Sequence, residues 1–285
     1  MSNSEPLIDH YTQNGLLASI EAGLTAMGKT PETVTVDDLA PVDEFHVGGR
    51  PATKHLLDQL DLTSSDHVID VGCGLGGPSR FAADQVARVT GIDLTPEYTQ
   101  VGNTLNGWVG LSDSVELHAG SALEMPFDAG TFDAGYMIHV GMNISDKRRL
   151  MRELARVLKP GALFGIYDIM RFTDAGPEYP VPWSSEAATS HVAHPEIYQE
   201  TAAEAGLIPV SENNRHRQAV EFFDRQAQAA AASQDGAAES APPAPPPLGL
   251  HLVMGSTVGS KIKNMAAAIR SEQIAPVEML FRRIG

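Results

Sequence analysis

From about residue 65 to residue 170, short apolar runs alternate with stretches whose apolar residues recur at helical spacing. Apolar runs rich in β-branched residues predict strands at 67–72, 88–94, 115–120, 132–140 and 162–169. The stretches between them predict helices at 78–86, 96–110 and 145–161. Strands that alternate with helices indicate an α/β fold, in which a parallel sheet is covered on both faces.

The flanking regions are less regular. Residues 172–195 are rich in Pro, Ser and Thr and predict a lid-like insertion, and residues 233–249 form a low-complexity, Pro-rich loop. Beyond the first five strands, the pattern predicts further helices at 194–206, 218–232 and 251–273 and strands at 207–213 and 277–284. We expect a mainly helical N-terminal lid at 1–60, followed by one domain at 61–285.

Composition and charge narrow the class of protein. The chain has 285 residues and a formal net charge of −16, which disfavours nucleic acid as a partner. Its single cysteine, Cys73, excludes an internal disulfide and a multi-cysteine zinc site. No apolar run is long enough for a membrane span, and the N-terminus has no secretory signal features, so we expect a cytoplasmic protein. The oligomeric state stays open.

Four glycines interrupt the chain directly after the first predicted strand, at positions 72, 74, 76 and 77 of HVIDVGCGLGGPSRFAA. Glycine at this density destabilises a regular element, so we expect a ligand to approach this backbone closely. A strand, a glycine-rich turn and a helix form the nucleotide end of a doubly wound sheet. Asp93, at the end of the second strand, can bind both ribose hydroxyls, which predicts an adenosine-containing ligand.

The glycine spacing separates two ligand classes. Asp70 and the sequence Gly72-Cys73-Gly74-Leu75-Gly76 differ from the dinucleotide fingerprint and resemble motif I of class I S-adenosylmethionine (SAM) methyltransferases. Later segments at 91–95, 120–127, 132–140 and 150–169 resemble further motifs of that family in the same order. The resemblance implies SAM as cofactor and a doubly wound, seven-stranded Rossmann-like sheet whose last strand is antiparallel.

Within this family, the sequence looks most like small-molecule enzymes. They include sterol, tocopherol and quinone C-methyltransferases, and N-methyltransferases of glycine, sarcosine, dimethylglycine and phosphoethanolamine. Several of them carry G-G-x-x-R after motif I, as Gly76 to Arg80 do here. Arg80 can either meet the SAM carboxylate or form an internal ion pair.

The resemblance also implies the residues that contact the cofactor: Asp70, Gly72, Cys73, Gly74, Gly76, Asp93, Leu94, Ser121, Ala122 and His139. Ser121 departs from the family, which often has Asp at this position to bind the adenine amino group. Cys73 is not expected to act as a nucleophile, because methyl transfer from a sulfonium needs none.

His139 is the candidate catalytic residue. It ends the fourth predicted strand at the carboxyl edge, where ligands bind in such sheets, and can act as a general base, position the substrate or simply pack. Candidate residues of the substrate pocket are Tyr11, His46, Met142, Asn143 and Trp183. His191 and His194 match no metal-ligand spacing with His139, so no metal is expected.

We therefore expect methyl transfer from SAM to a small-molecule acceptor, with the acceptor atom (N, O, S or C) open and a small amine slightly favoured. One alternative is C-methylation of a quinone or isoprenoid-type lipid. A second is a SAM-binding protein without catalysis, and a third is a nicotinamide-dependent oxidoreductase, which the glycine spacing disfavours.

Overall fold

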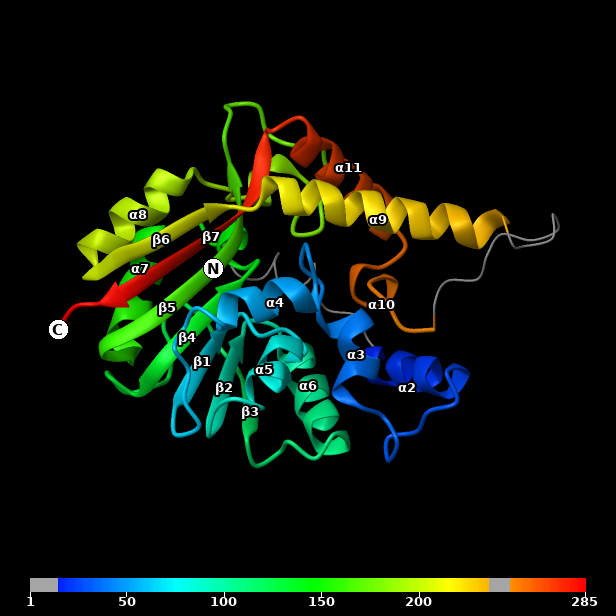
Figure 1. Cartoon of the computed structure of the whole chain (residues 1–285), viewed down its shortest axis with the longest axis horizontal. Helices are drawn as coiled ribbons and strands as arrows, with labels where there is room; N and C mark the ends of the chain where they lie inside the picture. The colour runs from blue at the N-terminus through cyan, green and yellow to red at the C-terminus, as the bar shows by residue number, and fades with distance from the viewer. Residues whose placement is uncertain (1–14, 236–246) are drawn as a thin grey trace.

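The computed structural model describes residues 15–235 and 247–285, and its centre is one seven-stranded sheet (Figure 1). The strand order is β3-β2-β1-β4-β5-β7-β6. The strands are β1 (His67–Val71), β2 (Arg88–Asp93), β3 (Val115–Ala119), β4 (Phe132–Ile138), β5 (Leu158–Arg171), β6 (Leu207–Asn214) and β7 (Ile274–Arg283). The first five pair in parallel, and β7 runs antiparallel to both β5 and β6. The predicted doubly wound, seven-stranded sheet with an antiparallel last strand is thus confirmed.

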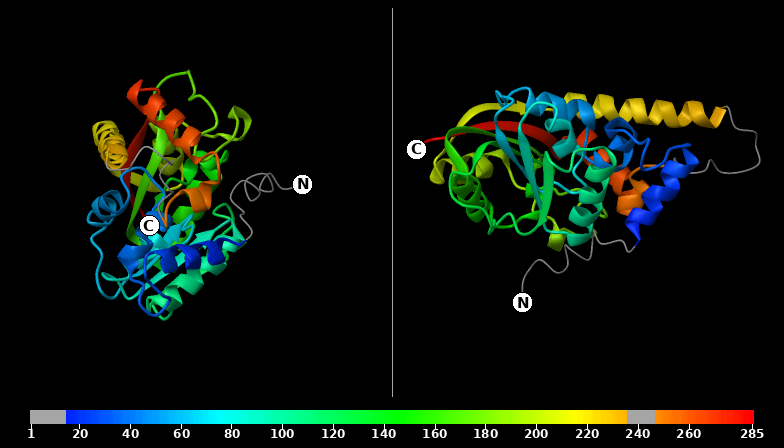
Figure 2. Two further views of the ribbon diagram at one scale, coloured as in Figure 1. Left: turned by 90° about the vertical axis from the view of Figure 1, so that its right-hand side faces the viewer. Right: turned by 90° about the horizontal axis from the view of Figure 1, so that it is seen from below.

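The sheet is buried on both faces, because neighbouring residues of a strand point to opposite sides. In β1, Ile69 and Val71 join one apolar cluster with α7 (Lys147–Val157) and α8 (Pro195–Glu204). Val68 joins the other, with α4 (Arg50–Leu57) and α5 (Gly77–Ala82). Long α9 (His216–Asp235) extends along the outside of the molecule (Figures 1 and 2).

The first two described helices lie at one end of the molecule, beside α6 (Pro96–Trp108). Helix α2 (Leu16–Ala26) packs with α10 (His251–Met254), and their apolar side chains share one cluster with α3 (Val36–Asp43) and α6. Helix α3 begins with a capping box in which Thr35 and Asp38 bond each other's backbone N–H groups. Figure 1 shows α2, α3 and α10 side by side.

Two helix predictions were wrong in detail. The stretch 251–273 is not one helix, because Gly255 adopts φ 71° and separates α10 from α11 (Val258–Arg270). Helix α7 ends at Val157, and β5 already begins at Leu158, so Pro160 and Gly161 lie in the strand. Asp146 caps α7 by accepting a hydrogen bond from the Arg149 N–H at 2.9 Å.

The predicted insertion at 172–195 contains the 3-10 turn η2 (Ala187–Thr189) and an isolated β-bridge between Val181 and Ser184, and α8 begins at its last residue. Most of the Pro-rich stretch 233–249 lies outside the described residues. Within the described parts of the chain, none of the helices has both the length and the apolar character that a membrane crossing requires.

Candidate functional site

The glycine loop lies at the carboxyl end of β1 and has the backbone geometry of a close-approach turn. Gly72, Gly74 and Gly76 have φ values of 77°, 52° and 83°, a region that side chains other than glycine rarely adopt. The loop is also crowded, because a Cβ at Gly72 would lie 2.1 Å from a methyl group of Val140. These glycines therefore form a tight cradle that a larger residue would fill.

Asp93 ties the end of β2 to this loop. One carboxylate oxygen accepts the Gly74 N–H at 3.0 Å, and the other accepts the Thr95 N–H at 2.8 Å. Burial raises the pKa of Asp93, while these two backbone hydrogen bonds act against that rise. The carboxylate is thereby fixed beside the cradle, and each oxygen keeps a further lone pair for a ligand hydroxyl.

Asp70 lies beneath the loop in β1. Its Oδ2 accepts hydrogen bonds from Ser79 at 2.6 Å and from Tyr136 at 3.2 Å. Burial raises the pKa of Asp70 from 3.8 to about 7, and the negative charges of Asp93 and Glu44 add to the rise. A cationic ligand group nearby would lower this pKa again.

The other predicted cofactor residues surround the same edge. The Cys73 side chain is buried, and its sulfur would lie 2.7 Å from a Cβ at Gly91, so it packs inward. Burial raises its pKa well above 9.0, which leaves an unreactive thiol. The Ser121 hydroxyl accepts the Leu123 N–H at 3.2 Å, and Leu94 and Ala122 are partly buried.

Arg80 is a structural residue. It is fully buried, and its guanidinium donates to Asp43 at 2.5 Å, to Asn106 at 2.7 Å and to the Leu75 carbonyl at 2.8 Å. Of the two roles left open by the sequence, the structure supports the internal ion pair. This pair holds the end of α3 against α5 and the glycine loop.

The segment between α3 and α4 covers the cradle. The Phe45 ring packs on Gly74, where a Cβ would come within 2.8 Å of the ring. Its neighbour Glu44 is buried, forms an ion pair with Arg50 and accepts a hydrogen bond from Thr53 at 2.6 Å. The segment is therefore held in place by its own side chains.

His46 lies on the same segment. Its Nε2 donates to the Gly49 carbonyl at 3.1 Å, since a carbonyl oxygen can only accept. Burial lowers the pKa of His46, although the Glu44 carboxylate acts in the opposite direction. The ring centroid lies 5.9 Å from that of His139, so the structure brings these two predicted residues together.

His139 follows β4 and has a left-handed backbone, with φ 55°. Its N–H donates to the Tyr167 carbonyl at 2.7 Å, and its ring lies 5.2 Å from the Tyr167 ring. Burial, followed by the nearby His46, lowers the pKa of His139 well below 6.5. Its Nε2 is buried without a hydrogen-bond partner among the described residues. Strained backbone and an unpaired polar atom are both typical of functional positions.

Most of the predicted pocket residues lie nearby. Met142 and Trp183 belong to one apolar cluster with Val47, which directly follows His46. Asn143 is partly buried, and its Oδ1 is buried with no partner in the described part of the chain. Tyr11 lies outside the described residues.

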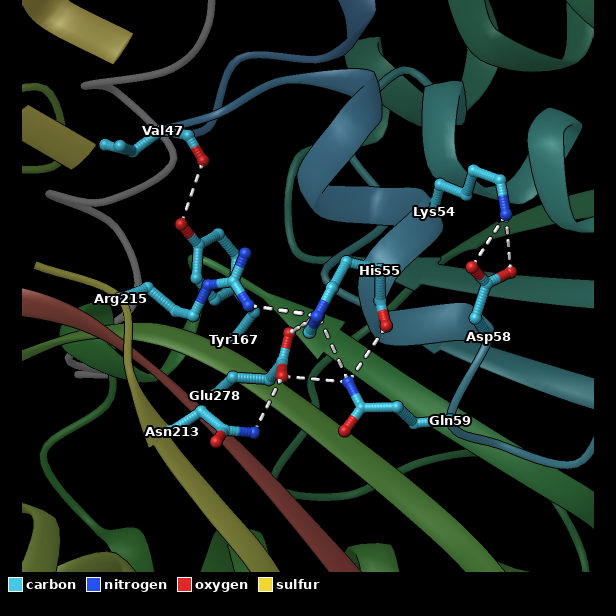
Figure 3. A network of polar contacts seen from close by, with 9 residues as sticks. All are labelled: Val47, Lys54, His55, Asp58, Gln59, Tyr167, Asn213, Arg215 and Glu278. Atoms are coloured by element: carbon cyan, nitrogen blue, oxygen red, sulfur yellow. Dashed lines mark hydrogen bonds and ion pairs between the residues drawn. The ribbon is translucent and has the colours of Figure 1, made fainter. Parts of the chain in front are cut away.

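Polar contacts join both the covering segment and α4 to the sheet, as Figure 3 shows. The Tyr167 hydroxyl donates to the Val47 carbonyl at 3.0 Å. Tyr167 pairs in the β-ladder with Glu278, which is 3% exposed. Glu278 lies 2.9 Å from Nδ1 of His55 and accepts the Gln59 amide at 2.8 Å.

The sequence alone does not single out Phe45, Glu44 or Tyr167. Tyr167 lies close to the carboxyl end of the fifth strand, the edge already assigned to ligands, and this position was the available signal. Phe45 and Glu44 adjoin His46 but have no motif of their own. Among residues 15–235 and 247–285, no three His, Cys, Asp or Glu side chains gather as metal ligands would.

Comparison with known proteins identifies the central part of the chain. Residues 69–166 match the family described as "Methyltransferase domain". Sterol 4-C-methyltransferase strm-1 of Caenorhabditis elegans is 36% identical over 120 residues, which make up 42% of this chain and 36% of that protein. The first three curated relatives are covered over 36%, 26% and 57% of their own lengths.

Solved structures share the fold. Geranyl diphosphate C-methyltransferase from Streptomyces coelicolor A3(2) has a TM-score of 0.64 and 20% identity, with 82% of this chain and 78% of that chain covered. Phosphoethanolamine N-methyltransferase 2 from Haemonchus contortus has a TM-score of 0.67 and 17% identity, with coverage of 93% and 60%. Both were solved with S-adenosylhomocysteine.

Proposed function

Because the chain carries a class I S-adenosylmethionine-dependent methyltransferase domain, as its motifs predict, we propose that it transfers the SAM methyl group to a small-molecule acceptor. The observation that carries the proposal is the glycine cradle with the Asp93 carboxylate fixed beside it. The covering segment at 44–49 and the insertion at 172–195 enclose the acceptor.

The residues at the strand edge fit the cofactor. Asp93 would bind the ribose hydroxyls, the cradle of Gly72 to Gly76 would receive the amino-acid part, and Asp70 would lie near its ammonium. Ser121 and Ala122 would contact the adenine, and Leu94 would pack on it. When bound, SAM supplies a methyl group that its sulfonium has already activated for displacement.

The protein's main task is to align the acceptor and exclude water. Phe45 and His46 cover the site, and His139 accepts a proton from the acceptor. Its pKa, well below 6.5, keeps the ring neutral at pH 7, so it is able to take that proton.

Charge and hydrogen-bonding capacity favour a neutral acceptor that carries a hydroxyl or an uncharged amine. The buried carboxylates of Glu44 and Asp168 have partners of their own: Thr53 and Arg50 for Glu44, and Tyr198 for Asp168. The two neutral histidines offer no negative charge to an ammonium group. The unpaired Oδ1 of Asn143, by contrast, needs a donor. We therefore favour a hydroxyl or an amine that binds in its neutral form over an amine that binds as a protonated ammonium.

The test is to titrate the protein with SAM and with NAD, then to incubate it with methyl-labelled SAM and a panel of phenols, neutral amines and zwitterionic amines. We expect SAM binding, no NAD binding, and labelled product from a neutral acceptor. SAM binding with no product from the panel or from a metabolite extract would favour the non-catalytic alternative. NAD binding without SAM binding would overturn the proposal.

A further inference from the structure

Lys147, the first residue of α7, is a buried cation whose hydrogen bonds all go to carbonyl oxygens. It is 5% exposed. Its ammonium donates to the carbonyls of Gly141 at 2.8 Å, Ile144 at 2.5 Å and His191 at 2.9 Å. An ammonium has three N–H donors, so three carbonyls use its full capacity.

These carbonyls belong to two segments that are far apart in sequence. Gly141 is the first residue of the 3-10 turn η1 (Gly141–Asn143), and Ile144 directly follows it. The turn begins two residues after His139 and carries Met142 and Asn143. His191 belongs to the insertion at 172–195. A further bond joins the same two segments, because the His191 N–H donates to the Met142 carbonyl at 2.8 Å. Lys147 thus fastens the insertion to the turn that bears two predicted pocket residues.

The turn is confined from its other side as well. A Cβ at Gly141 would lie 2.3 Å from Asp168 Oδ2 and 2.6 Å from the Tyr198 hydroxyl. Asp168 and Tyr198 are themselves joined by a 2.6 Å hydrogen bond. The turn is thus held between this pair and the ammonium of Lys147, and has little freedom to shift.

We propose that Lys147 is a positioning residue for the methyl acceptor: it fixes the turn at 141–144 against the insertion and so places Met142 and Asn143 at the acceptor. This rests on the function proposed above. Burying a charge is unfavourable, and a neutral side chain would fill the same space at less cost. The three carbonyls give the reason for a cation here, because without it they would be buried and unsatisfied.

Hydrogen exchange measured by mass spectrometry tests the proposal without an acceptor. We would compare wild type with Lys147→Met, which keeps length but has no donors, and Lys147→Arg, which keeps donors. Lys263→Met, an exposed lysine on α11, is the matched control. In Lys147→Met we expect peptides covering 139–145 and 187–193 to lose at least about ten-fold in protection. Ten-fold is the scale of one lost buried hydrogen bond, and the variant removes two from the first segment and one from the second. Protection of β1 peptides and the affinity for SAM should not change in Lys147→Met. Lys263→Met should match wild type in all of these measurements.

A pH series on wild type provides a second readout that needs no variant. Burial lowers the pKa of Lys147 from 10.5 to about 8, while the Asp168 carboxylate acts against this fall. Tyr198, whose ring lies 5.4 Å from the ammonium, and His191 are the other titratable groups beside it. A neutral amine has two N–H donors instead of three, so protection of 139–145 and 187–193, corrected for intrinsic exchange, should fall above about pH 8. Lys147→Arg should abolish that dependence.

Unchanged protection of both segments in Lys147→Met would overturn the proposal, as would equal loss in β1, which indicates a global effect. Once an acceptor is known, Lys147→Met should raise its KM more than it lowers kcat. If the chain fails to bind SAM but the two segments still lose protection together in Lys147→Met, then Lys147 does join the turn to the insertion and the proposed function is wrong.

Discussion

The Phe45 ring rests on Gly74, so close that a Cβ added to the glycine would lie 2.8 Å from the ring. One residue belongs to the segment between α3 and α4, the other to the loop after β1. Their contact means that the cofactor cradle and its cover are built as one unit. A cofactor that enters the cradle must therefore displace or slide beneath this ring.

The contact predicts a non-additive pair of substitutions. Gly74→Ala adds a methyl group at φ 52° against the ring, so we expect it to destabilise the fold by about 1–3 kcal/mol and to weaken SAM binding. Phe45→Ala should lessen that damage, because it removes the clash and leaves only the backbone strain. The free energies of unfolding of wild type, the two single variants and the double variant give the coupling free energy between the two positions. Strictly additive effects would show that the contact does not matter.

Asp93→Asn should weaken SAM binding by about 10–100-fold, the range expected when hydrogen bonds to a charged group are lost. The asparagine oxygen can still accept the Gly74 N–H, so the glycine loop should keep its shape, while the hydrogen bond from the Thr95 N–H is lost because the amide NH2 cannot accept. Isothermal titration calorimetry measures the affinity, and Asp113→Asn, at an exposed position, is the control. Equal affinities of the two variants for SAM would show that Asp93 does not bind the cofactor.

His139→Asn should lower kcat by about 10²–10⁴-fold, as expected for a lost general base, and leave SAM affinity within a few-fold of wild type. Asparagine tolerates the left-handed backbone at this position, so the substitution adds little strain. Single-turnover kinetics with labelled SAM measure the effect, with His118→Asn on β3 as the control. Unchanged turnover in His139→Asn would rule out the role of base.

Asp70 should make the cofactor-free protein less stable as the pH rises. Its folded pKa of about 7 exceeds the ordinary 3.8, so between these values the folded chain holds a proton that the unfolded chain has released. Stability from this group is therefore lost as the pH rises through that window. Melting temperatures from pH 5 to 8 should fall less steeply in Asp70→Asn than in wild type or Asp113→Asn. Identical slopes would contradict the raised pKa.

The sequence predicts the cofactor site where backbone conformation and strand position define it. The glycines at 72, 74 and 76 need positive φ, and Asp93 ends a strand whose apolar pattern is unmistakable. These features locate the cofactor edge without any knowledge of packing. The break at Gly255 was missed because glycine is tolerated inside helices, and the local pattern does not say when it will end one.

Contacts between distant segments could not be predicted from the sequence. Lys147 appears there as one more charged residue at a helix start, and its role depends on a carbonyl 44 positions away. Phe45 likewise becomes relevant only once α3 packs on α5. Tertiary packing, which periodicity does not encode, decides both.

Methyl transfer from SAM is best tested by following label from methyl-labelled SAM into small molecules of a metabolite extract, with wild type and Asp93→Asn compared side by side. We expect a methylated product with wild type and a strongly reduced yield with the variant at limiting SAM. If the wild-type protein neither binds SAM nor transfers its label, the chain is not a SAM-dependent methyltransferase.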